Sequence, residues 1–239
     1  MKERFRKKFE EQLAISESMI LCLTLAIVGG FLDAYTYISR GQVFANAQTG
    51  NIVLLGIGIA KGEPMAAVHY LLPILAFAVG IVVSEYLKSI NSDNLHWRQL
   101  VIGIEFVIIA IVGFLSPDNL DYIANVAISF VCALQVQAFR RIHGTPFATT
   151  MCTGNLRTGM EFFCVYLKTH DPSKLRKTLQ YFLVIAFFAL GAFLGAHLTW
   201  RWDAHAIFFC NILLAVVFLL LFEEKRFYKE DVIKKTPPQ

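Results

Sequence analysis

The chain has 239 residues, of which 56% are hydrophobic and 17% are charged, and its mean hydropathy is +0.55. This composition lies outside the usual range of soluble globular domains and is typical of an integral membrane protein. The net charge of +4 does not indicate nucleic-acid binding, because the basic residues lie in the tails and in short segments beside apolar runs.

Long apolar runs recur along the chain, and about 20 apolar residues suffice to span the hydrocarbon core of a bilayer as a helix. No small-residue cleavage site follows the first run, so we expect an uncleaved helix after the basic tail 1–17 and not a signal peptide. A second tail covers 223–239. We expect six transmembrane helices over residues 18–39, 65–88, 98–116, 121–142, 176–200 and 203–222.

Two shorter segments, 50–61 and 154–168, remain between these spans, and each begins within a Thr-Gly-Asn (TGN) sequence. They are either complete crossings or re-entrant half-helices. If both turn back, 18 of the 22 lysines and arginines fall on one side of the membrane, and fewer do so if both cross. The positive-inside rule therefore favours re-entrant half-helices, with both termini in the cytoplasm.

The two halves of the chain, 18–116 and 121–222, have the same order of elements: helix, half-helix, helix, helix. Gly41 and Phe44 recur 103 residues later, and the TGN sequence recurs 104 residues later. Because three crossings per half is an odd number, the second copy is inverted relative to the first. The expected fold is an all-α membrane protein with six transmembrane helices and two re-entrant half-helices, arranged as two inverted-topology repeats in one integral membrane domain.

The start of each half-helix carries chemistry that matters inside a membrane. It leaves four backbone N–H groups without intrahelical partners and about half a positive charge, which only protein or water can satisfy there. We expect Thr49 and Thr153 to be N-caps, and Gly50 and Gly154 to allow close approach of the backbone. Inverted repeats with interrupted segments are typical of secondary transporters that hold substrate near the midplane. The two starts are therefore expected to face each other across a polar chamber suited to an anion.

Other polar residues are given candidate roles according to their distance in sequence from the starts of the two half-helices. Asp33 is late in the first span, where a lipid-facing carboxylate costs about 2.5 kcal/mol or more, so it is expected to face protein, water or Arg40. It would serve as a proton acceptor, as a cation partner or as an interhelical hydrogen-bond partner, and its counterpart is Gln137. Arg157 would neutralise an anion or pair with Glu161. The candidate substrate-binding residues are Asp33, Gln48, Thr49, Gly50, Asn51, Gln137, Thr153, Gly154, Asn155 and Arg157.

Glu105 and Asn211 occupy matching positions in the last span of each half. We interpret them as helix-pairing residues, with a part in transport as the alternative. The five cysteines are scattered without a C-x-x-C pair, and the histidines lack metal-ligand spacing. The sequence therefore predicts no metal site and no cofactor.

The stretches GGFLDAYTYI and GQVFANAQTGNIVLLG, together with the second TGN, resemble the YoaK-like family of bacterial multi-pass membrane proteins, an uncharacterised domain family. The resemblance covers about residues 18–222, and AQTGN fits more closely than MCTGN of the second copy. It implies several spans in the bacterial cytoplasmic membrane, and it supplies no substrate and no binding residues.

The expected function is secondary transport, by alternating access, of a small polar solute, with an anion favoured by the helix dipoles. The alternatives are a channel, a non-transporting sensor or binding protein, and an intramembrane enzyme acting on a lipid with Asp33 and Glu105 as acid and base. The chain has no Walker-type, G-x-S-x-G or H-E-x-x-H sequence, so we do not expect an enzyme. The lipid bilayer is the expected partner, while proton coupling and homo-oligomerisation stay open.

Overall fold

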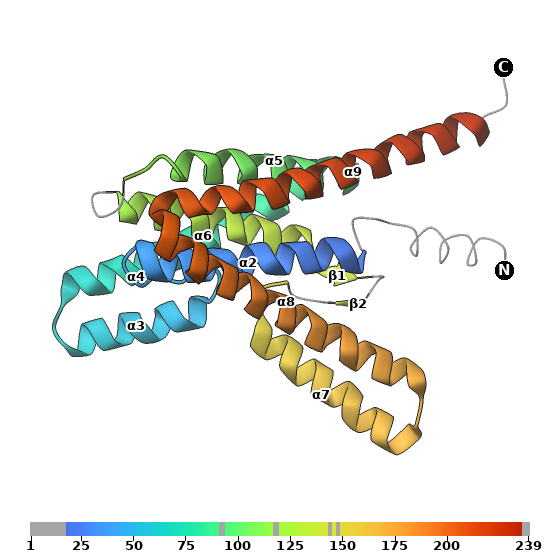
Figure 1. Cartoon of the computed structure of the whole chain (residues 1–239), viewed down its shortest axis with the longest axis horizontal. Coiled ribbons are helices and arrows are strands. Elements are labelled where there is room, and N and C mark those ends of the chain that lie inside the picture. Colours follow the sequence, from blue (N-terminus) through green and yellow to red (C-terminus); the bar gives the residue numbers. More distant parts are fainter. Residues whose placement is uncertain (1–17, 91–93, 117–119, 143–144, 147–148, 236–239) are drawn as a thin grey trace.

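The computed structural model describes residues 18–90, 94–116, 120–142, 145–146 and 149–235, with side chains except at 94–96, 141–146 and 223–235. The described chain is almost entirely helical (Figure 1). Its elements are α2 (Met19–Ser39), α3 (Gln48–Ala60), α4 (Pro64–Ile90), α5 (Asn94–Val112), α6 (Asp121–Ala138), β1 (Arg141–Ile142), β2 (Thr145–Pro146), α7 (Cys152–Thr169), α8 (Pro172–Trp202), η2 (Asp203–Ile207) and α9 (Phe208–Lys235).

Four segments of the described chain are long and apolar enough to cross a membrane. They are α2, α4, α6 and the stretch Pro172–Phe222, which contains α8, η2 and the first part of α9. Apolar side chains on α3, α4 and α7 point outward, among them Ile52, Leu75 and Leu167. Outward apolar side chains suit lipid, so the expectation of an all-helical integral membrane protein is confirmed.

The expected span boundaries at 98, 116, 142, 176 and 203 lie four or five residues from the ends of α5, α6, α8 and α9, and the structure explains two of these differences. The fourth span was expected to reach residue 142, but α6 ends at Ala138, where Arg98 donates to the Ala138 carbonyl group (3.2 Å) that the helix end leaves unpaired. A two-stranded antiparallel ribbon, β1 with β2, follows it. The last span was expected to begin at 203, but Asp203 has a positive φ of 47° and the 3₁₀ turn η2 separates α8 from α9.

Glycines allow two pairs of helices to cross at very short distances. In the pair α2 and α8, a Cβ added to Gly30 would lie 2.0 Å from the carbonyl oxygen of Phe188, and one added to Gly191 would lie 2.1 Å from that of Ile27. In the pair α4 and α6, a Cβ on Gly80 would lie 2.5 Å from a backbone oxygen of α6. Membrane helices commonly pack through such small residues. The two helices of each pair run parallel, because residues later in one helix contact residues later in the other.

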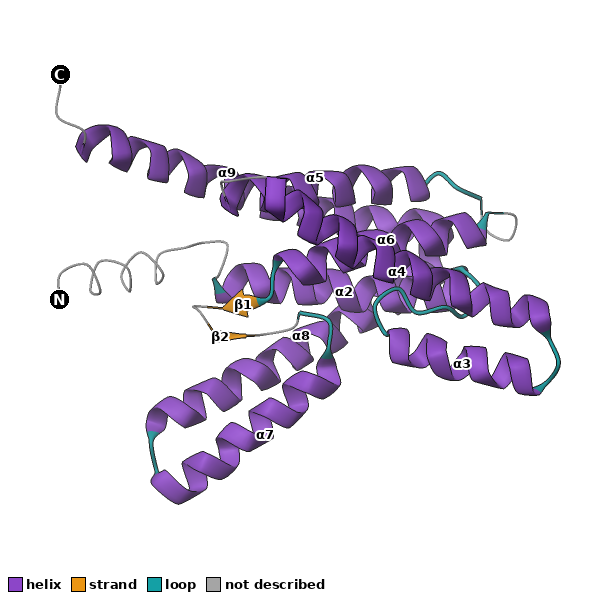
Figure 2. Ribbon diagram, turned by 180° about the vertical axis from the view of Figure 1, so that it is seen from behind, coloured by secondary structure: helices purple, strands orange, loops and turns teal. Residues whose placement is uncertain are grey.

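α3 and α7 each fold back against the next helix, α3 on α4 and α7 on α8, as two hairpins that diverge from the body (Figure 2). Beside the hairpin of α3 and α4, the loop that follows α2 contacts α4: the His69 Nε2 atom lies 2.7 Å from the Gly41 carbonyl oxygen. The His69 ring also meets the Tyr122 ring at the start of α6, with centroids 5.1 Å apart. The end of α2 and the starts of α4 and α6 therefore lie close together.

Candidate functional site

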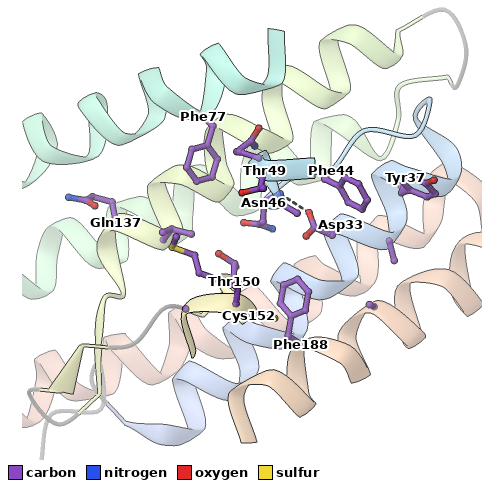
Figure 3. A pocket seen from close by; sticks show the side chains of 18 of the residues that line it. Asp33, Tyr37, Phe44, Asn46, Thr49, Phe77, Gln137, Thr150, Cys152 and Phe188 are labelled. Atoms are coloured by element: carbon purple, nitrogen blue, oxygen red, sulfur yellow. Dashed lines mark hydrogen bonds between the residues drawn. The ribbon is translucent and has the colours of Figure 1, made fainter. Parts of the chain in front are cut away.

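The starts of α3 and α7 line one cavity of about 740 Å³ (Figure 3). α3 contributes Gln48 and Thr49, and α7 contributes Thr153 and Gly154. Asp33 of α2 faces the same space. Much of the remaining wall is apolar and comes from α4, α6 and α8, through Phe77, Ile81, Val136, Phe188 and Ala192. Two segments about a hundred residues apart in sequence thus share one partly polar site.

Asp33 lies at the beginning of α3. Its Oδ1 atom accepts the backbone N–H of Asn46 at 2.6 Å, and the N–H groups of Ala45 and Ala47 are near enough to contribute further hydrogen bonds. The residue is only 6% exposed. These amides lead directly into Gln48, the first residue of α3, so the carboxyl group lies at the positive end of the α3 helix dipole. The protein backbone is therefore one partner of Asp33, as expected.

The expected N-caps Thr49 and Thr153 are wrong. α3 follows Ala47 and α7 follows Met151, and neither of these cap residues makes a side-chain capping bond. Thr49 and Thr153 are each the second residue of their helix, and both are exposed. At α3 the physical reason is that Asp33 supplies an acceptor for the preceding amides from another helix, so no local hydroxyl group is needed.

Asn51 does not line the cavity, because its side chain is fully buried against the preceding loop. Its Nδ2 atom donates to the Phe44 carbonyl oxygen (2.7 Å) and to Gln48 Oε1 (2.9 Å). Its Oδ1 atom accepts the Phe44 backbone N–H (2.9 Å). Gly50 lies under the same loop, since a Cβ there would come within 2.7 Å of the Phe44 ring. Asn51 and Gly50 therefore hold this loop on the first turn of α3.

The α7 end is more open than the α3 end. A Cβ added to Gly154 would meet no atom within 4 Å, although Gly154 lines the cavity. Asn155 is 3% exposed and does not line it. Arg157 points away, with 81% of its side chain exposed, and its Nε atom pairs with Glu161 at 2.9 Å. Of the two roles expected for Arg157, the structure therefore selects the helix ion pair.

Gln137, the expected counterpart of Asp33, also lines the cavity (Figure 3). Its side-chain amide donates to Glu85 of α4. Asp33 receives backbone amides from the chain that begins α3, whereas Gln137 bonds to a neighbouring long helix. The two halves of the cavity therefore differ in charge and in hydrogen bonding.

Comparison with known proteins places the chain in a family. The model of a family described as a protein of unknown function (DUF1275) matches residues 21–220. The chain belongs to this family. It is also 27% identical over 185 residues to the UPF0700 transmembrane protein YoaK of Bacillus subtilis (strain 168), a match that covers 74% of this chain and 80% of that protein. No solved structure matches. The YoaK-like resemblance read from the sequence is thereby confirmed.

Several cavity residues of this DUF1275 member escaped the sequence analysis. Asn46, Phe44 and Arg140 all line the cavity. Asn46 and Phe44 lie in the stretch VFANAQTGN, so a reading of the whole stretch as one loop wrapped around the TGN sequence would have included them. No signal in the sequence identified Arg140, because it is adjacent to the end of α6 and resembled a topological charge.

Proposed function

We propose that this protein is a secondary transporter that moves a small polar solute, with an anionic group, across the bacterial cytoplasmic membrane by alternating access. The observation that carries the proposal is the shared cavity, in which two half-helix starts and a buried carboxyl group meet. A site of this kind, made of helix ends in a membrane protein, suits a solute with a charged group.

The packing supports two inverted repeats, α2 to α5 and α6 to α9. The first helix of each repeat packs on the third helix of the other, so that α2 pairs with α8 and α4 pairs with α6. The half-helix of each repeat packs on its own third helix. These pairs exchange under a twofold operation, which is the arrangement expected of inverted repeats.

The packing also supports six crossings with two re-entrant half-helices. Gly41, which follows α2, lies beside His69 in the second turn of α4, so α4 begins on the side of the membrane at which α2 ends. A complete crossing by α3 would have placed these two residues on opposite sides. The 13 residues of α3 would extend about 20 Å, which is less than the thickness of the hydrocarbon core.

The two helix starts differ in how they would receive a solute. The amides that lead into α3 already hold the Asp33 carboxyl group, while Gly154 on α7 leaves open space. We therefore assign the anionic group of the solute to the α7 start, with Arg140 of the cavity wall as a second source of positive charge. Protonation of Asp33 would weaken its hydrogen bonds with the backbone N–H groups that lead into α3, and these groups could then bind the solute. Proton binding and solute binding would therefore favour each other.

The test is uptake into liposomes that contain the purified protein, after a thermal-shift screen of small carboxylates and inorganic anions has found a stabilising solute. The substitution Gly154→Leu fills the cavity at the α7 start without meeting another atom at its Cβ position. We expect it to abolish both the thermal shift and the uptake while the protein stays folded. The matched control is Gly56→Leu on α3, because a Cβ at Gly56 also meets nothing within 4 Å and Gly56 does not line the cavity.

Equal uptake by the two leucine variants would refute the assignment of the site. Binding that Gly154→Leu abolishes, without uptake by the wild type, would identify a sensor in place of a transporter. Uptake that never saturates with solute concentration would identify a channel. Release of a chemically altered solute or lipid would identify an intramembrane enzyme.

A further inference from the structure

Glu105 is a buried carboxyl group in the middle of α5 that the cavity does not use. It lies seven residues after Arg98 and seven before Val112, the last residue of the helix, which is about 10 Å from each along the axis. Its exposed fraction is 0%, and neither carboxyl oxygen has a hydrogen-bond partner among the described residues. A carboxyl group in this position needs either a counter-charge or a proton.

The neighbouring helices offer Glu105 no counter-charge. The titratable groups that face it are neutral thiols, Cys132 from α6 and Cys210 from α9. The ion pairs of the described chain join Arg40 to Asp121 and Arg157 to Glu161, and neither includes Glu105. On α5 itself, Arg98 donates to the end of α6. Acidic residues on elements that contact α5 include Glu85 of α4, held by Gln137, and Asp203 of η2.

The counterpart of Glu105 shows what hydrogen bond this position makes. In the second half, Asn211 donates its side-chain N–H to the Phe106 carbonyl oxygen of α5 at 2.7 Å. An amide can donate such a bond, a carboxylate cannot, and a carboxylic acid can. Asn211 Oδ1 and the two oxygens of Glu105 are all buried acceptors without a hydrogen-bond partner among the described residues. A proton on Glu105 would turn one of these acceptors into a donor.

Cys132 connects Glu105 to the cavity. It is near enough to interact electrostatically with both Glu105 and Asp33, and the Asn46 side chain lies beside its thiol. Ser129, one turn earlier on α6, is fully buried with an unpartnered hydroxyl group. Hydroxyl, thiol and amide groups of this kind can hold ordered water and relay protons between two carboxyl groups.

We propose that Glu105 is a second proton-binding site, which exchanges a proton with Asp33 during the transport cycle; this inference rests on the proposed transport function. In the exchange, the O–H bond of Glu105 breaks, an O–H bond forms on the Asp33 carboxylate, and the negative charge moves from Asp33 to Glu105. Asp33 then releases the amides at the start of α3, and the cavity accepts an anionic solute. The charge left on Glu105 is returned to neutral by a proton from one aqueous face.

Infrared spectroscopy of the purified full-length protein in lipid tests the proposal without a solute. The carbonyl stretch of a protonated carboxylic acid is separate from the bands of carboxylates. We expect the wild type to show this band at neutral pH, Glu105→Gln to lose it, and the matched acid-to-amide control Glu161→Gln, at an exposed residue, to keep it. We expect Asp33→Asn to keep the band and to change its response to pH, because the two carboxyl groups exchange a proton.

An unchanged band in Glu105→Gln would overturn the proposal. A band that disappears on addition of Na⁺ at constant pH would overturn it as well, and would identify a sodium site. If Glu105→Gln does not fold, wild-type protein labelled with ¹³C-glutamate replaces it: the band must shift with the label, because Glu105 is the buried glutamate of the described chain. The infrared test uses no solute, so it is independent of the uptake test. Loss of the band in Glu105→Gln supports the proton site even if the protein shows no uptake. If the protein shows uptake but Glu105→Gln keeps the band, the proton site is rejected and the transport function is not.

Discussion

Arg40 forms a buried ion pair that joins several helices at one end of the bundle. Its exposed fraction is 0%, and its Nη1 atom lies 3.1 Å from Asp121 Oδ1. Its Nη2 atom donates to the Tyr35 hydroxyl group (2.9 Å) and to the Leu115 carbonyl oxygen (2.8 Å). The Tyr35 hydroxyl group in turn donates to the carbonyl oxygen of Ala204 (3.1 Å). One guanidinium group therefore connects α2 to the end of α5, the start of α6 and η2.

The substitution Asp121→Asn keeps the shape of the side chain and removes its charge, so that Arg40 stays buried without a counter-charge. Loss of one partner of a buried ion pair costs about 3 to 5 kcal/mol, and 13% exposure of the Asp121 side chain favours the lower end of that range. In a chain of this size each kcal/mol lowers Tm by about 2 to 4 °C. We therefore expect a decrease in Tm of about 6 to 12 °C for a loss of about 3 kcal/mol.

The assay is thermal unfolding of the purified protein in detergent, followed by circular dichroism. The chain supplies its own control in the pair Arg157–Glu161, whose side chains are 81% and 59% exposed. Glu161→Gln is the same chemical change at an exposed pair and should lower stability by about 0.5 kcal/mol or less. If Asp121→Asn lowers Tm no more than Glu161→Gln does, the argument from burial is refuted. A double variant with Arg40→Met should lose less than the sum of the two single variants, because the uncompensated charge is then gone.

Three further predictions concern other parts of the fold. Gly191→Val should lower the yield of folded protein by creating a clash with the α2 backbone, at a cost of at least about 3 kcal/mol, while Gly56→Val should give normal yields in size-exclusion chromatography. Asn51→Leu should cost about 2 kcal/mol in thermal unfolding, because the part-buried N–H and C=O groups of Phe44 lose their partners; a loss below about 1 kcal/mol would contradict this. Asp171 accepts hydrogen bonds from the hydroxyl group and the backbone N–H of Ser173, and these bonds keep the pKa of Asp171 below its usual range. The stability from Asp171 is therefore present at neutral pH and lost as the pH falls, so Asp171→Ala should lower Tm at neutral pH, with a difference that closes in acid.

The sequence predicted where α3 and α7 begin better than it predicted what their residues do. The two TGN sequences lie at the starts of α3 and α7, because recurring polar residues in an apolar chain mark breaks in its helices. The individual roles depend on side chains that arrive from elsewhere in the fold. Asp33 supplies the acceptor at α3, which a local pattern of hydroxyl groups cannot reveal. Asn51 bonds to a loop seven residues away, and its sequence does not show in which direction the side chain points.

Buried charges were the least predictable feature. Arg40 follows α2 and resembled an ordinary charge at a membrane surface, but it is fully buried because Asp121, 81 residues later, pairs with it. Glu105 was interpreted as a helix-pairing residue, and its isolation from every described cation depends on the packing of α5 against α6 and α9. Partners so distant in sequence are set by tertiary packing and not by local patterns.

The glycine contacts indicate which parts of the molecule would move as units. α2 and α8 touch through their backbones at Gly30 and Gly191, and so do α4 and α6 at Gly80, so neither pair can separate without loss of close packing. Each pair contains one helix from each half of the chain, and the cavity lies between the two pairs. In the proposed transport cycle, motion that opens the cavity would therefore occur between the α2–α8 pair and the α4–α6 pair. The Arg40–Asp121 bond crosses this boundary from α2 to α6, so the proposed alternating access would require that the bond break at one stage of the cycle.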